Sequence, residues 1–280
     1  ASDGSSAVEI ALKMSFHYWH NHGQLEKNQF LCMAGSYHGE TLGTLSVGSV
    51  GLYRDAYAPL LRQAATVPSP DARWATAGET AADCARRAAN VLAAYLAEHH
   101  ESIAALIIEP LVQGAGGMII YDPEYLRQAR ALCDRYQIHL IADEIMTGFG
   151  RTGSLFAWEQ TRTASPDLLC LSKGITGGYL PLSAVLCTDA VYEAFYDDDP
   201  ARGFLHSHSY TGNALACRAA LAVLDIFRDD DVVAANRDRA QRWSVAAAPL
   251  ARHARVRNFR QRGMIIAFDV ATSRPDFARW

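Results

Sequence analysis

Residues 138–153 read IHLIADEIMTGFGRTG, an apolar run that ends on two adjacent carboxylates, Asp143 and Glu144, and then enters a glycine-rich loop. A short, continuously apolar run predicts a strand buried on both faces, as strands of parallel sheets are. Two functions compete for this segment. Its glycines from residue 148 onward have the spacing G-x-G-x-x-G of dinucleotide-binding loops, whereas Asp143 stands directly after the strand, where α/β enzymes place catalytic charges.

Strand-length apolar runs recur along the chain, at 28–34, 64–68, 103–110, 167–172 and 182–188. Between several of them lie helical patterns, such as the alanine-rich segment 79–99 and residues 123–136, which begin with a proline suited to a first helical turn. This alternation predicts an α/β fold with a mostly parallel sheet flanked by helices.

The C-terminal part follows a different pattern, in which helices near 212–227 and 231–247 precede a strand at 263–270. We therefore expect a large domain over 1–228 and the beginning of a smaller α+β domain over 229–280. The chain starts in a loop that enters a helix and stops soon after a strand. We expect it to be an internal fragment that lacks the N-terminal part of the large domain and the rest of the small one.

The composition excludes several classes of protein. A formal net charge of −4, with no like-charge run longer than three aspartates, gives no attraction for nucleic acid or anionic lipid. No apolar stretch reaches the roughly 18 residues that a membrane helix needs. The six cysteines are scattered without a C-x-x-C motif, which is typical of reduced thiols in a cytoplasmic protein.

Residues directly after the strands are candidates for chemistry, because ligands of parallel sheets bind at the carboxyl ends of the strands. Lys173 follows the run LLCLS and precedes a glycine, which predicts a buried stem and an amine suited to Schiff-base formation; the alternative is a surface lysine on a turn. Asp143 could simply cap the next turn. Lys173 and Asp143 are separated by one strand-to-strand crossover, so both can lie at one edge of the sheet. There the carboxylate could keep a pyridine nitrogen protonated.

Two further segments add an anion site and an aromatic face. Gly4 and Ser5 precede a helix, where free backbone N–H groups attract phosphate, although ordinary N-capping by Ser5 or Ser6 would explain the same residues. Tyr37 follows another strand and offers a flat ring. An amine, a carboxylate, a stacking ring and a phosphate cradle are together what pyridoxal phosphate requires.

Six blocks of the chain, spread from residue 1 to about 228, resemble the class III aminotransferases of fold type I, which use pyridoxal 5'-phosphate. They are SDGSSAVEIALKM (2–14), SYHGET (36–41), IIEPLVQGAGGM (107–118), LIADEIMTGFGRTG (140–153), LSKGITGGYLPLSAV (171–185) and HSHSYTGNALACRAA (206–220). The fourth and fifth blocks are the specific ones.

The resemblance implies a role for each matching residue. Lys173 would hold the cofactor covalently and move the proton, and Asp143 would pair with the pyridine nitrogen. Tyr37 would lie against the ring and line the substrate side, while Gly4 and Ser5 would bind the phosphate.

The remaining implied positions lie nearer the rim. Gln113 would approach the ring hydroxyl, and His208 would belong to the cofactor shell. Ser209 would reach the phosphate of a neighbouring subunit, which implies a homodimer with shared active sites. Glu109 and Ser207 would line the substrate side.

Within the family, the segments VQGAGGM, CLSKGITGGYLPLSAVL and FLHSHSYTGN are most similar to members that transfer an amino group from S-adenosylmethionine to 8-amino-7-oxononanoate in biotin biosynthesis. A cationic donor and an acceptor with a long apolar chain suit a pocket lined by Tyr37 and small residues. The alternative is a broad ω-amino acid:pyruvate transaminase, which shares the same catalytic residues.

Other functions are remote. An NAD-dependent oxidoreductase needs its glycines at the end of the strand, whereas here they begin five residues later. No G-x-S-x-G elbow is present for a serine hydrolase, and His206 and His208 lack a third metal ligand at a usable spacing, so no metal is expected. Intact Lys173 and Asp143 argue against a non-catalytic structural subunit.

Overall fold

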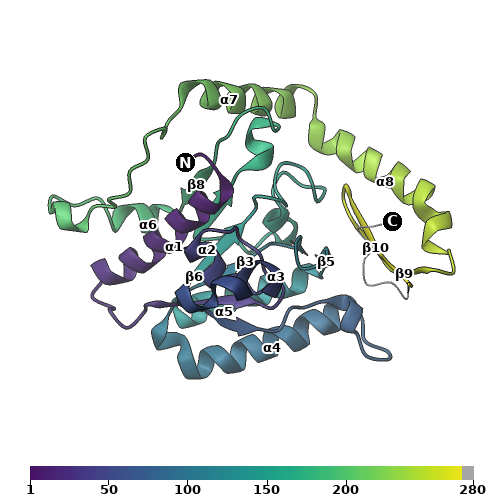
Figure 1. Ribbon diagram of the computed structural model, residues 1–280, viewed down its shortest axis with the longest axis horizontal. Helices are drawn as coiled ribbons and strands as arrows, with labels where there is room; N and C mark the ends of the chain where they lie inside the picture. Colours follow the sequence, from purple (N-terminus) through teal and green to yellow (C-terminus); the bar gives the residue numbers. More distant parts are fainter. Residues whose placement is uncertain (273–280) are drawn as a thin grey trace.

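The structure is a computed structural model that describes residues 1–272. Its helices, strands and 3-10 turns (η) alternate along most of the chain (Figure 1). In chain order they are α1 (Gly4–Asn21), β1 (Gln29–Met33), α2 (Leu42–Ser46), α3 (Gly51–Arg54), η1 (Asp55–Leu60), β2 (Ala65–Val67), η2 (Ala72–Trp74), α4 (Ala81–His99), η3 (His100–Ser102), β3 (Ile103–Ile108), β4 (Val112–Gln113), β5 (Ile119–Ile120), α5 (Pro123–Tyr136), β6 (His139–Asp143), η4 (Ala157–Thr161), β7 (Leu168–Leu171), η5 (Lys173–Thr176), β8 (Ala184–Cys187), α6 (Asp189–Glu193), η6 (Pro200–Arg202), α7 (Ala214–Asp229), α8 (Val232–Ala251), β9 (Val256–Arg262) and β10 (Ile265–Val270).

A six-stranded sheet with the order β2-β1-β3-β6-β7-β8 forms the centre of the molecule. The pairs from β2 to β7 are parallel, and β8 joins β7 in the antiparallel direction. The predicted strands and the mostly parallel sheet are therefore confirmed. Because β6 and β7 are parallel neighbours, Asp143 and Lys173 follow adjacent strands at one edge, as the sequence predicted.

Helices cover both faces of the sheet. Successive side chains of a strand point to opposite faces, and here the side chains on both faces are apolar. In β3, Leu106 and Ile108 pack with the core under α4 and α5, while Ala105 and Ile107 pack with α1. All of β3 is buried. Burial on both faces explains why these strands are continuously apolar, and each fully buried Ile or Leu contributes roughly 1.5–3 kcal/mol.

Local signals set the ends of the long helices. Thr80 and Asp83 form a reciprocal capping box at the start of α4, and Asp122 caps α5 ahead of Pro123. At α1 the cap is Asp3, whose carboxylate accepts hydrogen bonds from the Ser6 backbone N–H at 2.9 Å and from the Ser6 hydroxyl at 2.7 Å. The alternative prediction, in which Ser5 or Ser6 caps the helix, therefore named the wrong residue.

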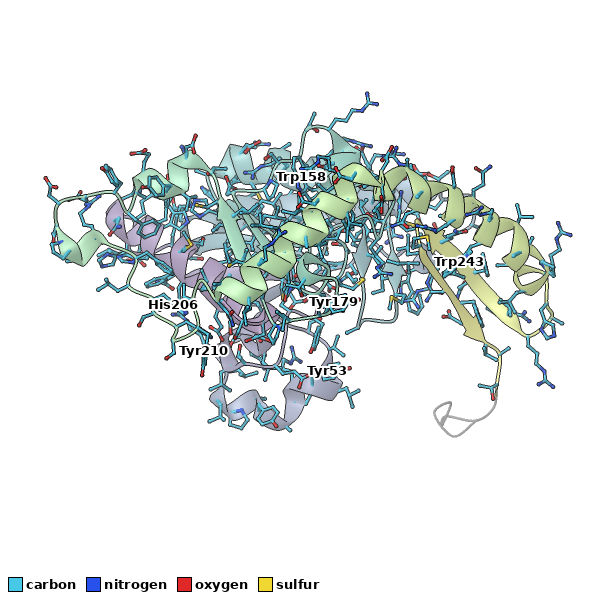
Figure 2. All side chains as sticks on the ribbon, turned by 90° about the horizontal axis from the view of Figure 1, so that it is seen from above. Tyr53, Trp158, Tyr179, His206, Tyr210 and Trp243 are labelled. Atoms are coloured by element: carbon cyan, nitrogen blue, oxygen red, sulfur yellow. The ribbon has the colours of Figure 1, made fainter. Side chains whose placement is uncertain are left out.

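The C-terminal part forms its own small sheet, the antiparallel hairpin of β9 and β10, which lies beside α8. Figure 2 shows α8, which carries Trp243, and the hairpin together at one end of the molecule. The division into domains over 1–228 and 229–280 stays a prediction, and its residues 273–280 lie outside the described residues.

Among residues 1–272, no helix combines the length and apolar content that would let it cross a membrane. The six cysteines are unpaired thiols.

Candidate active site

A cavity of about 370 Å³ opens at the carboxyl ends of the parallel strands. Residues from five separate segments meet there. The lining residues are Asp3, Gly4, Ser5, Tyr37, His38, Gly39, Glu109, Gly114, Ala115, Met118, Asp143, Ile145, Met146, Ser172 and Lys173. The cavity therefore brings together Gly4, Ser5, Tyr37, Glu109, Asp143 and Lys173, six of the residues that the sequence singled out.

Lys173 lines this cavity and has an unusual backbone conformation. Its φ of 43° lies in the left-handed region, which non-glycine residues rarely adopt and which often marks functional sites. The expectation of a buried stem was wrong: Lys173 begins the η5 turn beyond the end of β7 and is exposed. Among residues 1–272 its amine has no hydrogen-bond or ion-pair partner, so it is free to react.

The residue after this lysine, Gly174, packs closely against the side chain of Phe149. A Cβ atom on it would lie 2.8 Å from the side chain of Phe149. The close approach holds the η5 turn against the loop that follows β6.

Asp143 is buried, with 5% of its surface exposed, and its carboxylate has two donors. The His38 ring nitrogen Nδ1 lies 2.8 Å from Oδ2, and the Ile145 backbone N–H donates to Oδ1 at 3.0 Å. The second contact caps the turn after β6, so the capping alternative is also realised. Each carboxylate oxygen has two lone pairs, which leaves acceptor capacity toward the cavity.

Glu109 is a second buried carboxylate in the cavity wall. It accepts hydrogen bonds from the backbone N–H groups of Tyr37 at 3.1 Å and Gly114 at 2.8 Å. Burial raises its pKa to about 7, while the charge of His38 lowers it and the charge of Asp143 raises it. A carboxyl group poised near neutrality is suited to holding or releasing a proton.

Tyr37 and Ser5 shape the opposite side of the cavity. The Tyr37 hydroxyl donates to Glu40 at 2.8 Å, and its ring lies 4.9 Å from the ring of Tyr53. Burial and the bond to Glu40 raise the pKa of Tyr37 to about 12. Gly39, with φ of 127°, packs so tightly on Ser5 that only glycine fits there, and this contact brings the residues after β1 against the start of α1.

Four predicted residues do not line the cavity. Gln113 is fully buried behind it, where its amide donates to the Ala34 carbonyl at 2.9 Å and accepts from Ser69. His208 is 3.1 Å from the Ser2 hydroxyl, next to the loop that starts α1. Ser207 and Ser209 are exposed on the segment before α7.

Sequence reasoning missed three apolar cavity residues, Ile145, Met146 and Met118, and one polar residue, His38. Ile145 lies in the turn after β6, where strand alternation no longer indicates which way a side chain points. A Cβ atom on Gly4 would lie 2.9 Å from the Ile145 Cδ1, so the two residues are in close contact. Met118 comes from the loop between β4 and β5, a pairing that the sequence did not predict.

The glycine-rich loop has a structural use. Gly150, with φ of 78°, lies against Phe227 of α7 and Asn236 of α8, and the Gly153 carbonyl accepts from Arg237 at 2.7 Å. The loop thus contacts the C-terminal helices. Within the described part of the chain, no three His, Cys, Asp or Glu side chains converge in a group that could hold a metal ion.

Comparison with known proteins gives consistent relatives. The family model Aminotransferase class-III matches residues 1–278. The adenosylmethionine-8-amino-7-oxononanoate aminotransferase of Helicobacter pylori is 48% identical over 276 residues, which are 96% of this chain and 61% of that protein. The enzyme of the same name from Geobacter sulfurreducens is 40% identical, over 98% of this chain and 61% of that protein.

Solved structures resemble the chain equally well. The adenosylmethionine-8-amino-7-oxononanoate aminotransferase of Methanocaldococcus jannaschii superposes with a TM-score of 0.88 at 33% identity, over 96% of this chain and 60% of that one. An amine transaminase from an uncultivated Pseudomonas species, in its PLP-bound internal aldimine form, has a TM-score of 0.90 at 37% identity, over 96% and 61%. The chain thus spans about three fifths of the length of these relatives.

Proposed function

The chain belongs to the class III aminotransferases, with the fold-type I architecture expected from its sequence, and we propose that its cavity binds pyridoxal 5'-phosphate and supports amino-group transfer. One observation carries the proposal. Asp143 is the last residue of β6, and Lys173 lies just beyond the end of the parallel neighbour β7. Both line the same cavity, so one ring could contact the amine and the buried carboxylate.

The residues present fit this cofactor. The Lys173 amine has no partner among the described residues, and its backbone is held in a costly conformation. The buried Asp143 carboxylate retains acceptor capacity. Gly4 and Ser5 lie in the first turn of α1, whose end favours anions, although the Asp3 carboxylate already takes the Ser6 N–H.

When bound, pyridoxal phosphate supplies an electron sink that stabilises negative charge on a substrate carbon. The chain's own residues supply the rest. Asp143 would hold the proton on the ring nitrogen. The Lys173 Nζ would hold the cofactor until the substrate amine displaces it, and the freed amine would then carry a proton to and from the substrate carbon. Tyr37 and Ile145 both line the cavity, and they would restrict the position of the bound ring.

We propose S-adenosylmethionine and 8-amino-7-oxononanoate as the amino donor and acceptor. Relatives with that activity in their names are 34–48% identical to this chain. A broad amine transaminase is the second candidate, supported by the structural similarity to the Pseudomonas enzyme. The small lining residues Gly114 and Ala115 leave room for a long apolar acceptor.

We also propose a homodimer in which Ser209 contacts the cofactor phosphate of the partner. Its exposure on a single chain supports a role outward from this cavity. The assignments of Gln113 to the ring hydroxyl and of His208 to the cofactor shell stay predictions, as does a cytoplasmic location, which the six unpaired thiols support.

The experiment that tests the proposal is borohydride reduction of the full-length protein after incubation with pyridoxal phosphate, followed by peptide mapping. We expect the added mass on Lys173. Lys13, whose Nζ lies 3.0 Å from the His206 Nδ1, and the buried Lys27 serve as internal controls. Label on either of them, or no label, contradicts the proposal.

A further inference from the structure

The turn between β4 and β5 forms part of the cavity wall. Gly114, Ala115 and Met118 of this turn line the cavity. Met118 has a φ of 51°, in the left-handed region that is costly for a residue with a side chain. Inside the turn, the N–H groups of Gly117 and Met118 both donate to the Gly114 carbonyl, at 3.2 and 2.9 Å. The carbonyls of Gly117 and Met118 take their donors from outside the turn.

One arginine of the C-terminal hairpin supplies both of these donors. Arg260 of β9 donates from Nε to the Met118 carbonyl at 2.8 Å and from Nη2 to the Gly117 carbonyl at 2.7 Å. The guanidinium is planar and its N–H groups form a rigid fork, so one side chain can bind two consecutive carbonyls at once. A lysine ammonium has no such fork. The hairpin therefore fixes the backbone of a turn that lines the cavity.

The remaining side of the Arg260 guanidinium is held within the hairpin. Its Nη1 donates to the Asn258 carbonyl at 2.7 Å and to Oδ1 of Asp269 at 3.2 Å. Asp269 of β10 also accepts from the side-chain amide of Asn258 at 2.7 Å, which fixes the carboxylate. The Arg260 side chain is only 13% exposed, so water competes little for these bonds. A guanidinium held on both sides is suited to fixing the position of its partners.

The segment before α4 supports the same turn from another direction. Arg73 of η2 is anchored by the buried Asp71, whose Oδ2 accepts from Nη2 at 2.7 Å. Its Nη1 lies 3.8 Å from Asp269, and it would lie 3.7 Å from a Cβ atom on Gly117. Asp269 therefore lies between two arginines that both contact the turn. This links the hairpin to the main part of the structure beside the cavity.

We propose that Arg260 is a positioning residue for the amino acceptor: it holds the carbonyls of Gly117 and Met118, and thereby fixes the wall against which the apolar chain of the acceptor lies. This inference rests on the proposed function. Without the fork, the turn would be free to leave its costly conformation, and Met118 would no longer stay in one place. Among residues 1–272, Arg260 does not line the cavity, so its loss should leave the chemistry at Lys173 and Asp143 intact.

Three variants separate this role from a general effect on the hairpin. Arg260→Leu removes both donors and keeps an apolar stem. Arg257→Leu is the matched control, because Arg257 lies on the same strand and its Nη1 donates to the carbonyls of Ala254 and Val256 in its own segment. Arg260→Lys keeps a positive charge beside Asp269 but replaces the fork by a single ammonium. It carries the test if the leucine variant does not fold.

The kinetic measurement uses the full-length protein loaded with pyridoxal phosphate, saturating S-adenosylmethionine and varied 8-amino-7-oxononanoate. We expect Arg260→Leu to raise KM for the acceptor about 10-fold, as loss of a hydrogen bond to a charged group implies, with kcat within about threefold of wild type. Arg260→Lys should raise KM less, and Arg257→Leu should match wild type. A purely structural loss would instead reduce the amount of active enzyme, which lowers kcat and leaves KM unchanged.

Hydrogen–deuterium exchange of the full-length protein without substrates tests the anchor independently of activity. Backbone amides of residues 114–120 should exchange faster in Arg260→Leu than in wild type or Arg257→Leu, because the turn opens more often once its carbonyls lose their donors. If the wild-type protein does not transfer an amino group to the acceptor, the proposed function fails, and the acceptor role of Arg260 fails with it. If it does, but Arg260→Leu matches Arg257→Leu in KM or in exchange, only the role of Arg260 is overturned.

Discussion

Gly263, in the turn between β9 and β10, lies so close to Thr152 that a Cβ atom on it would fall 2.4 Å from the Thr152 carbonyl carbon. Beside this contact, the Met264 N–H donates to the Arg151 carbonyl at 2.9 Å. The loop that looks like a dinucleotide motif in the sequence therefore serves as a docking surface for the C-terminal hairpin.

Gly263→Ala should lower the free energy of unfolding, because the new methyl group meets backbone, which cannot move aside as a flexible side chain would. The control is Gly78→Ala, since Gly78 also has a positive φ, 86°, but nothing lies within 4 Å of its Cβ position. We expect the control to cost about 1 kcal/mol from backbone strain and Gly263→Ala to cost roughly 1–3 kcal/mol more from overpacking. Equal losses in chemical denaturation would show that the close contact contributes nothing.

The large-domain sheet could be predicted from sequence because its strands are buried on both faces and read as continuous apolar runs. The hairpin strand β9 was not predicted, since VRNFRQR has few apolar residues among charged ones and is mostly half-buried. The direction of β8 was also not predictable, because an apolar run does not encode whether its neighbour is parallel.

The candidate site also contains residues that the sequence could predict and residues that it could not. Residues that directly follow a strand, such as Lys173 and Asp143, could be located because strand ends are visible in sequence. The wall formed by His38 and Met118 could not, because it depends on how loops pack. For Gln113 the structure shows hydrogen bonds to Ala34 and Ser69, and its assignment to the ring hydroxyl stays a prediction.

Asp143→Asn should preserve the fold but reduce turnover by several orders of magnitude in the full-length protein, because a neutral amide cannot hold a proton on the ring nitrogen. The adjacent Glu144 offers a matched control. It is equally buried but lines no part of the cavity, and its carboxylate accepts from Ala157 and Trp158 N–H and from the Thr147 hydroxyl. Glu144→Gln should lower the melting temperature and leave kcat of the folded enzyme near wild type. Similar losses of kcat in both variants would contradict the assignment.

His139 should make the protein sensitive to acid. Burial lowers its pKa to about 4, against an ordinary value near 6.5, and its ring stacks on Trp19 and contacts the Ser15 hydroxyl at 2.9 Å. Between these two values the unfolded chain binds the proton more strongly, so stability falls as pH drops from about 6.5 to 4, by on the order of 3 kcal/mol. Denaturation of His139→Gln as a function of pH should show a smaller loss, whereas His99→Gln, at an exposed position, should match wild type.

Ser209→Ala should weaken retention of pyridoxal phosphate modestly, because one hydroxyl donor among several phosphate contacts is removed. If the serine acts across a subunit boundary, the full-length protein must be a dimer. Sedimentation velocity at micromolar concentration measures this directly, and Ser207→Ala, at the neighbouring exposed position, is the control. A monomer that retains the cofactor tightly would contradict both the homodimer and the role of Ser209.

The choice of substrate can be decided by half-reactions of the full-length, cofactor-loaded protein. S-adenosylmethionine should convert the bound cofactor to its amino form, seen as a change in visible absorbance, and 8-amino-7-oxononanoate should reverse that change. The physical basis is the cavity wall: Gly114, Ala115 and Met118 provide an apolar path without a charged side chain, which suits the long acceptor chain. β-Alanine is the control donor. Conversion by β-alanine together with no response to S-adenosylmethionine would favour the broad ω-amino acid transaminase, because that activity needs no site for the sulfonium donor.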